Sequence, residues 1–363
     1  MLSDKSEWPL TPIRTSWDDL LNGIESISSW ESKRKEIKAR FLELIKNESA
    51  PECTVALEIK IESEWDFEDY HIQYVSYWVE EDERAHAYMA IPNTNAPEDG
   101  FPAVVCLHGT INWGARQTLG LLPEADDPHA SNPEIAGKDF ARQLVRRGYV
   151  TISPEHFCSG ARTPKEGSFD TSSFYRKHPN WTAVGKYIYD SYIACSIVAE
   201  RSDVNDKLIG VTGHSLGGSG SVWLAAFDDR ISCVVPSCTA PTFRENPGPL
   251  HWSRDSWYVY FPQLRKEFLA GNQVQCDLHE MMALIAPRAL LDRFALNDGN
   301  GVCQSHRVML HLKLHDLYKL LNKEQAHSFL VFGDGHSIPE ISQKSMLSWL
   351  DCWLKRNGNP LDC

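Results

Sequence analysis

One serine in this chain stands in a setting that suits nucleophilic chemistry. Residues 213–217 read Gly-His-Ser-Leu-Gly, between an apolar run at 208–211 and a helix-like segment at 219–226. A sharp turn from a strand into a helix lifts a serine hydroxyl out of the sheet edge, and small neighbours let strand and helix approach closely. The turn also places the Leu216 N–H at a helix N-terminus, where it can hold a developing oxyanion. We therefore predict that Ser215 is a nucleophile and that the Leu216 N–H belongs to its oxyanion hole.

A serine hydroxyl is a weak nucleophile, so it needs a base within hydrogen-bond reach and a third group that orients the base. In one large group of hydrolases these residues follow along the chain in the order serine, acid, histidine. His336 lies after the last predicted strand and before the closing helix, and it is the predicted base. Asp298, at the end of the predicted strand that begins at Arg288, is the favoured acid. Glu245, shortly after the preceding strand, is the alternative acid.

A second oxyanion donor is expected in the loop that follows the predicted strand at 103–107. The chain continues there with His108, Gly109 and Thr110, and the Thr110 N–H is the predicted donor, with the neighbouring Ile111 N–H as the alternative. We interpret His108 as a residue that shapes this loop and not as a catalytic base, because it stands at the end of an early strand.

The surrounding residues predict the elements that must position these groups. Three β-type runs come first, and from residue 103 onward strand-like and helix-like runs alternate. Such alternation is typical of a mostly parallel sheet with helices on both faces, in which ligands bind at the carboxyl ends of the strands. The predicted strands are 54–61, 71–78, 85–91, 103–107, 149–152, 208–211, 231–235, 289–294 and 329–332, and the main predicted helices are 30–45, 140–147, 188–200, 219–226 and 341–354.

Five short motifs together resemble the α/β-hydrolase superfamily, and more narrowly its dienelactone-hydrolase-like and acetyl xylan esterase-like members. The motifs are Leu107-His108-Gly109, Arg147-Gly148-Tyr149-Val150, the glycine-rich run 210–218, Ala286-Pro287-Arg288 and Gly335-His336-Ser337. The resemblance covers about 68–354, and it implies an eight-stranded sheet and two-step ester hydrolysis through an acyl-enzyme. Dienelactone hydrolases themselves have a cysteine nucleophile, whereas this chain has Ser215.

Length and composition favour one large catalytic domain with additions. We expect an α/β-hydrolase domain over 53–363, an N-terminal helical extension over 1–52 and an insertion at about 239–285.

Long loops at strand ends are commonly functional, so they are expected to supply substrate-binding residues. The candidates are Trp113, Glu155 and Arg162 in two such loops, and Trp252 and Trp257 in the aromatic-rich stretch 241–261. Aromatic side chains there either stack on sugar or aryl groups or pack the insertion onto the core.

The remaining composition excludes several classes of protein. A net charge of −13 argues against nucleic acid as a partner, and no apolar run approaches the length of a membrane span. The N-terminus lacks the pattern of a secretory signal, so we expect a cytoplasmic protein. No C-x-x-C pair is present; Cys106, Cys233 and Cys238 are interpreted as small buried hydrophobes. His306, His311 and His315 are interpreted as a partly exposed helix face, and we expect no metal and no cofactor.

Together these patterns predict a serine hydrolase of carboxylic esters, with acetyl or carbohydrate esters as the expected substrates. The alternatives are a peptidase of the prolyl-oligopeptidase type and a non-catalytic binding protein on a hydrolase scaffold. The sequence does not determine the acyl group, the alcohol or the oligomeric state. Because the base must be neutral, activity is expected to rise as the pH climbs past about 6 to 7.

Overall fold

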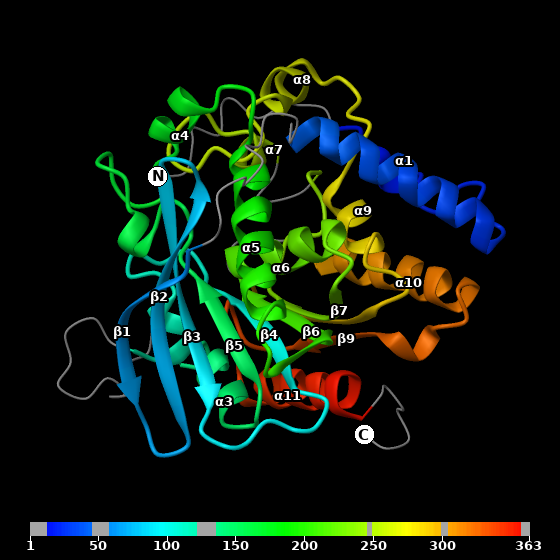
Figure 1. The fold of residues 1–363 in the computed structure, drawn as a ribbon. Helices are drawn as coiled ribbons and strands as arrows, with labels where there is room; N and C mark the ends of the chain where they lie inside the picture. Colours follow the sequence, from blue (N-terminus) through cyan, green and yellow to red (C-terminus); the bar gives the residue numbers. More distant parts are fainter. Residues whose placement is uncertain (1–12, 46–57, 122–135, 245–248, 299–303, 357–363) are drawn as a thin grey trace.

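A mixed β-sheet forms the centre of the molecule (Figure 1). The computed structural model describes residues 13–45, 58–121, 136–244, 249–298 and 304–356. Within these residues the sheet has nine strands in the order β1-β2-β3-β5-β4-β6-β7-β8-β9. The strands are β1 (Lys60–Asp66), β2 (Tyr70–Glu80), β3 (Glu83–Pro92), β4 (Phe101–Leu107), β5 (Val150–Pro154), β6 (Val204–His214), β7 (Ile231–Ser237), β8 (Ala289–Ala295) and β9 (His327–Phe332).

The sheet has an antiparallel part and a parallel part. Strand β2 pairs antiparallel with β1 on one side and with β3 on the other, and β3 pairs antiparallel with β5. All pairings from β5 through β4 to β9 are parallel. The mostly parallel sheet is thus confirmed, with one strand more than the eight that the family resemblance implied, because β1 adds an outer strand on β2. This strand begins at Lys60, and residues 54–57 of the predicted run lie outside the described residues.

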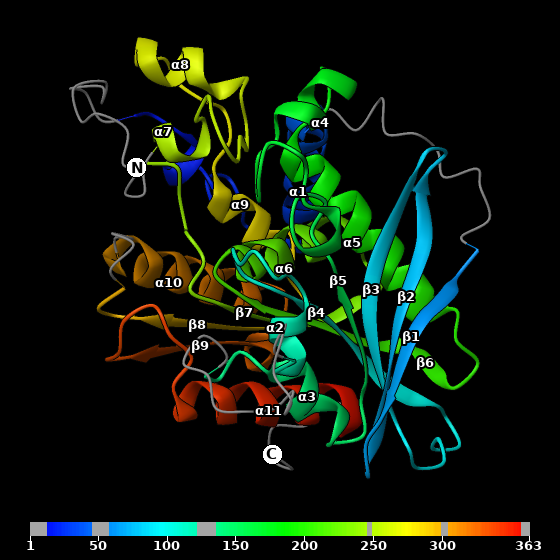
Figure 2. The same ribbon diagram turned by 90° about the vertical axis from the view of Figure 1, so that its left-hand side faces the viewer.

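Helices cover both faces of the sheet, as predicted (Figure 2). On one face lie α5, α6, α9 and α10, and on the other lie α3 and α11. The helices are α1 (Ile27–Ile45), α2 (Arg116–Leu119), α3 (Phe140–Val145), α4 (Ser172–Lys177), α5 (Ala183–Ala199), α6 (Leu216–Phe227), α7 (Pro249–Trp252), α8 (Leu264–Ala270), α9 (Leu278–Ala283), α10 (Gln304–Leu320) and α11 (Glu340–Lys355). Helix α5 begins before the predicted start at residue 188, because the Thr182 hydroxyl caps it by accepting the Gly185 N–H at 3.0 Å.

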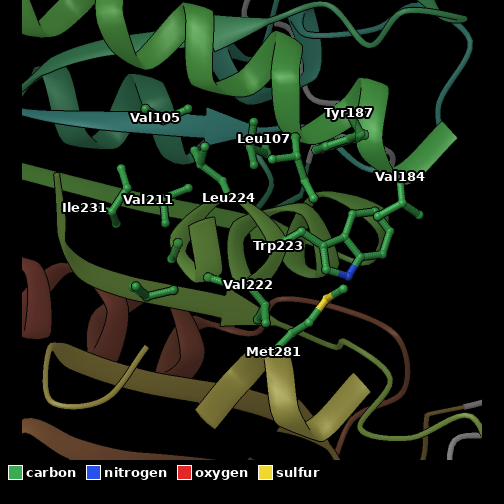
Figure 3. Packing of buried hydrophobic residues seen from close by; sticks show 14 of the residues in the cluster. Val105, Leu107, Val184, Tyr187, Val211, Val222, Trp223, Leu224, Ile231 and Met281 are labelled. Carbon is green, nitrogen blue, oxygen red and sulfur yellow. The ribbon is translucent and has the colours of Figure 1, made fainter. Parts of the chain in front are cut away.

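Each central strand contributes side chains to two hydrophobic cores, because successive side chains point to opposite faces of the sheet. In β4, Val105 and Leu107 belong to the core under α5 and α6, whereas Val104 and Cys106 belong to the core under α3 and α11. Figure 3 shows how Trp223 of α6 packs in the first of these cores. Truncation of a buried residue of this size costs about 3–5 kcal/mol. The strand ends near the nucleophile are therefore held by a closely packed layer.

The described part of the N-terminal segment lies against the insertion that precedes β8. The hydroxyls of Thr15 and Ser16 donate to Asp277 at 2.6 Å and to Glu280 at 2.7 Å, and these two carboxylates form the capping box of α9. Helix α1 adds an ion pair of 2.8 Å between Arg40 and Glu280. The N-terminal segment thus braces the insertion.

Candidate active site

The elbow between β6 and α6 holds Ser215 in a backbone conformation that ordinary side chains rarely adopt. Its φ is 59° and its ψ is −119°. The Ser215 N–H donates to the Ser237 carbonyl at 2.9 Å, and the Ser215 carbonyl accepts the Ser219 N–H at 2.9 Å. Ser215 is partly exposed although His214 and Leu216 on either side are buried. The turn therefore presents one hydroxyl at the sheet edge. The helix begins at Leu216, three residues before the predicted start at residue 219, and the Leu216 N–H lies at its N-terminus, as predicted.

The two glycines of the elbow are required by close approach. A Cβ on Gly213 would lie 2.3 Å from the Gly217 carbonyl oxygen, and a Cβ on Gly217 would lie 2.0 Å from the Leu107 carbonyl oxygen. Contacts this short do not occur between real atoms, so any larger residue would push α6 away from β4 and β6.

The predicted acid and base meet at the same edge of the sheet. Asp298 follows β8, His336 follows β9, and Asp298 Oδ2 accepts a hydrogen bond from His336 Nδ1 at 2.8 Å. The Asp298 side chain is 1% exposed and the His336 side chain is 27% exposed, so the imidazole alone reaches the surface. The His336 ring centroid lies 4.6 Å from that of His214, the residue before Ser215. The structure thus brings the ring beside the elbow. The alternative acid, Glu245, lies outside the described residues.

Hydrogen bonds shift the protonation equilibrium of His336. Burial by itself lowers the pKa of this imidazole, but its hydrogen bonds with Asp298 and Cys238 favour the charged form and raise the pKa to about 9. His214 behaves in the opposite way, because burial and the neighbouring His336 lower its pKa. Two adjacent histidines therefore differ in charge, and the one bound to the carboxylate holds the proton more tightly.

Cys238 is a member of this site that sequence reasoning missed. It follows β7 directly, is 5% exposed and has a φ of 52°. The interpretation as a buried hydrophobe is correct for its burial but omits its contact with His336. Its place at the carboxyl end of a parallel strand, where ligands collect, was the signal that could have found it.

The loop after β4 lies beside the nucleophile. A Cβ on Gly109 would be 3.8 Å from the Ser215 Cβ, and Thr110, the predicted second oxyanion donor, follows as an exposed residue. His108 Nδ1 donates to the Gly109 carbonyl at 2.7 Å, and His108 Nε2 accepts the His156 N–H at 3.2 Å. Burial lowers the pKa of His108 to about 4, so this imidazole is neutral. These contacts fit the interpretation of His108 as a loop-shaping residue.

Two of the predicted substrate-binding residues, Glu155 and Arg162, have buried side chains. The Glu155 carboxylate accepts the Ala115 N–H at 3.2 Å, and burial raises its pKa to about 7. Arg162 binds Asp190 at 2.6 Å and also pairs with Glu83. These contacts join the loops to the scaffold, and we therefore assign both residues a structural role instead of the expected position on an open rim.

The tryptophans of the predicted substrate site fall into different settings. Trp252 is 4% exposed and packs on Tyr260, with ring centroids 4.8 Å apart. Trp257 is 44% exposed, and its indole N–H donates to the Ser168 carbonyl at 2.9 Å. Trp113 is half-buried in the loop between β4 and α2. Trp252 therefore packs the insertion onto the core, whereas Trp257 and Trp113 are more exposed than Trp252.

The expected exposed histidine face of α10 is wrong for His311. This residue is fully buried, and its Nε2 lies 2.8 Å from Asp292 Oδ2. His315 is exposed and His306 is half-buried. The helical spacing predicted that the three histidines lie on one helix. It did not predict that the Asp292 carboxylate of β8 lies behind α10.

Comparison with known proteins identifies the fold. No family model matches the chain. Over 217 residues, 60% of this chain, the sequence is 30% identical to YtaP of Bacillus subtilis (strain 168), which is named as a hydrolase, and the match spans 66% of that protein. The methylesterase BT1017 superposes with a TM-score of 0.68 at 15% identity, over 94% of this chain and 69% of that chain. A glucuronoyl esterase from Solibacter usitatus superposes with a TM-score of 0.68 at 14% identity, over 96% and 99%.

These similarities and the strand order define the chain as a protein of the α/β-hydrolase fold. The predicted resemblance to the α/β-hydrolase superfamily is confirmed for the fold. No helix within the described ranges combines the length and the apolar character needed to cross a membrane.

Proposed function

We propose that this protein is a serine hydrolase that cleaves carboxylic esters, with Ser215 as nucleophile, His336 as base and Asp298 as the residue that orients the base. The observation that carries the proposal is the 2.8 Å hydrogen bond from His336 to Asp298 at the strand edge where the elbow presents Ser215. The name of the relative YtaP, a hydrolase, supports the class of reaction.

The hydrogen bond between His336 and Asp298 decides which nitrogen of the imidazole acts as the base. Because His336 Nδ1 donates to Asp298, Nε2 is the nitrogen that accepts the Ser215 proton as the hydroxyl attacks the ester carbonyl. The N–H groups of Leu216 and Thr110 stabilise the oxyanion, and His336 then protonates the leaving alcohol. Water repeats the cycle on the acyl-enzyme and releases the acid.

Carbohydrate esters are the substrate class that we propose. Two proteins with this fold are named as a methylesterase and a glucuronoyl esterase. Trp257 on the insertion is 44% exposed, and an aromatic ring of this kind packs well against a sugar ring. The acetyl esters expected from the sequence belong in the same comparison of substrates.

A fluorophosphonate probe tests the nucleophile directly, because it labels only an activated serine. Wild type is expected to be labelled and Ser215→Ala is not. Ser219→Ala is the matched control, since Ser219 lies one turn along the same helix and is buried. Equal labelling of Ser215→Ala and wild type would disprove the assignment.

A substrate panel then tests the class of reaction. It contains p-nitrophenyl esters of increasing acyl length, acetylated sugars, methyl esters of uronic acids and a prolyl p-nitroanilide. Hydrolysis of the esters that is lost in Ser215→Ala supports an esterase. Cleavage of the anilide alone would instead favour the peptidase.

A further inference from the structure

A thiol, an imidazole and a carboxylate converge at the candidate active site. One donor atom each from Cys238, Asp298 and His336 lies within 4.8 Å of the others. The three residues follow three neighbouring parallel strands, β7, β8 and β9, so the order of the strands brings them to one edge of the sheet. The cluster is a product of the fold and not of one flexible loop.

The backbone holds the thiol in place. The Cys238 N–H donates to the Arg293 carbonyl of β8 at 2.8 Å, and the φ of 52° turns the chain sharply after β7. Ala295 and Phe332 pack against Cys238 and cover it with apolar surface. Backbone strain of this kind persists only where the surrounding structure supports it.

This donor set is the one that zinc prefers. Zn²⁺ binds cysteine sulfur at about 2.3 Å and histidine nitrogen or carboxylate oxygen at about 2.0–2.2 Å, usually in tetrahedral geometry. Donor atoms that share one such ion therefore lie roughly 3–4 Å apart. The three donors here are within 4.8 Å, so a change of about 1 Å, within the reach of side-chain rotation, closes them on one ion.

We propose that Cys238, Asp298 and His336 form a binding site for a soft divalent cation such as Zn²⁺, and that the bound ion blocks ester hydrolysis. The binding site stands on the geometry alone, whereas the block rests on the proposed function. With three protein ligands, the fourth position of the ion is left for water.

The block follows from the tautomer of the imidazole. If Nδ1 of His336 binds the ion, the neutral ring carries its proton on Nε2 and cannot accept the proton of Ser215. If Nε2 binds the ion, the base is occupied directly. In both cases Asp298 turns from the ring to the metal, and the Cys238 thiol releases its proton to solvent as the metal–sulfur bond forms.

Cadmium absorption tests the binding step without any activity. Cd²⁺ bound to a thiolate gives an ultraviolet charge-transfer band, and titration of wild type is expected to saturate near one equivalent. Cys238→Ser is expected to lose the band. Cys276→Ser is the matched control, because Cys276 is also a buried free thiol and lies just before α9. Its band is expected to match that of wild type.

Zinc affinity and inhibition complete the test. Loss of one ligand is expected to weaken Zn²⁺ binding by at least about tenfold in calorimetry, and Cys238→Ser should need correspondingly more Zn²⁺ for half-inhibition of ester hydrolysis. A chelator is expected to restore wild-type activity.

The two proposals fail separately. If the protein binds the metal through Cys238 but hydrolyses no ester, the metal site stands and the proposed hydrolase function is wrong. If ester hydrolysis depends on Ser215, but metal binding and inhibition are equal in wild type and Cys238→Ser, the hydrolase function stands and the proposed metal site is wrong.

Discussion

Two aspartate–histidine pairs lie on β8 and just beyond its end, and they have the same hydrogen-bond length. Asp292 Oδ2 is 2.8 Å from His311 Nε2, and Asp298 Oδ2 is 2.8 Å from His336 Nδ1. Both aspartates are buried. What separates the pairs is the rest of their surroundings.

The Asp292 pair is closed on every side. Asp292 and His311 are both 0% exposed, and the Arg307 guanidinium donates to both carboxylate oxygens at 2.6 and 2.7 Å. The other ring nitrogen of His311 lies 3.1 Å from His327. Phe329 stacks on the His311 ring, with centroids 4.7 Å apart. No nitrogen or oxygen of this pair is left for a substrate.

In the pair of Asp298 and His336, only the carboxylate is buried and the imidazole reaches the surface. We call this pair the open pair, and the pair of Asp292 and His311 the closed pair. His336 is 27% exposed and lies on a loop beside the elbow. Burial would raise the pKa of Asp292, but Arg307 and His311 hold it below its usual value, whereas the partners of His336 raise the pKa of the imidazole. The comparison teaches that an Asp–His distance does not distinguish the two pairs, whereas the exposure of the imidazole does, because the His311 ring is fully buried and the His336 ring reaches the surface.

Among substitutions in the two pairs, the largest effect on activity is expected from Asp298→Asn. The substitution preserves the shape of the side chain but removes the charge that favours the imidazolium, and in serine hydrolases it lowers kcat about 10⁴-fold. Steady-state hydrolysis of a p-nitrophenyl ester measures the loss. The change in the free energy of unfolding is expected to stay near about 1 kcal/mol, because an amide still hydrogen-bonds with the ring. Wild-type kcat in Asp298→Asn would move the role of the acid elsewhere.

The largest effect on stability is expected from Asp292→Asn. Removal of this charge leaves the buried Arg307 guanidinium without its counter-ion, which costs about 3–5 kcal/mol. Urea unfolding followed by circular dichroism measures the loss. The kcat per folded molecule is expected to equal that of wild type. If Asp292→Asn instead lost activity at unchanged stability, the assignment of the two pairs would be reversed.

Acid titration of the same variant sharpens this result. The pKa of Asp292 in the folded protein lies below its usual value of 3.8. The ionised carboxylate therefore stabilises the fold above that pH, and the contribution is lost as the pH falls through the lowered pKa. Wild type is expected to lose more stability than Asp292→Asn over this acidic range, as measured by urea unfolding at a series of pH values.

The pH profile of ester hydrolysis tests the open pair. His336 must be neutral to accept a proton, so its raised pKa moves the acidic limb of kcat/KM from the range of 6 to 7, expected for an ordinary histidine, to about 9. Below that pH the rate is expected to fall about tenfold per pH unit, with a neutral substrate. A limb at about 6 to 7 would show that Asp298 and Cys238 do not stabilise the imidazolium in the free enzyme.

The sequence predicted the features of the site that depend on local patterns. The elbow around Ser215 is read from adjacent glycines, and the mostly parallel sheet is read from alternating apolar runs, because both signals lie within a few residues. His336 was predicted from its place after the last strand. Asp298 was predicted as its favoured partner from its place after the preceding strand, and the structure shows the hydrogen bond between the two side chains.

Residues whose partners come from distant strands could not be predicted. Arg162 was expected on an open rim because its loop is long, but its partners Glu83 and Asp190 come from β3 and α5. The His311 contact depends on the register between β8 and α10, and the contact of Cys238 depends on the order of β7, β8 and β9. Burial and pairing at these positions are properties of the tertiary structure.

Another buried histidine, His156, combines features of both pairs, and the smallest expected effect is found there. Like His311 it is buried, and like His336 it connects to the site, since its N–H donates to His108, which in turn holds the Gly109 carbonyl. The Tyr258 hydroxyl from the insertion lies 2.9 Å from His156 Nε2. The chain of contacts therefore runs from the insertion to the loop of the proposed oxyanion donor.

Tyr258→Phe removes one member of this chain of contacts and keeps its ring. The loss of one buried hydrogen bond costs about 1 kcal/mol, which corresponds to about a fivefold lower kcat if the whole cost falls on the oxyanion loop. Tyr260→Phe is the control, because Tyr260 is a buried neighbour in the same insertion. A lower kcat with unchanged unfolding would place His156 with the open pair, since the bond would then act on the reaction. A lower stability with unchanged kcat would place it with the closed pair, where a buried imidazole only holds the fold together.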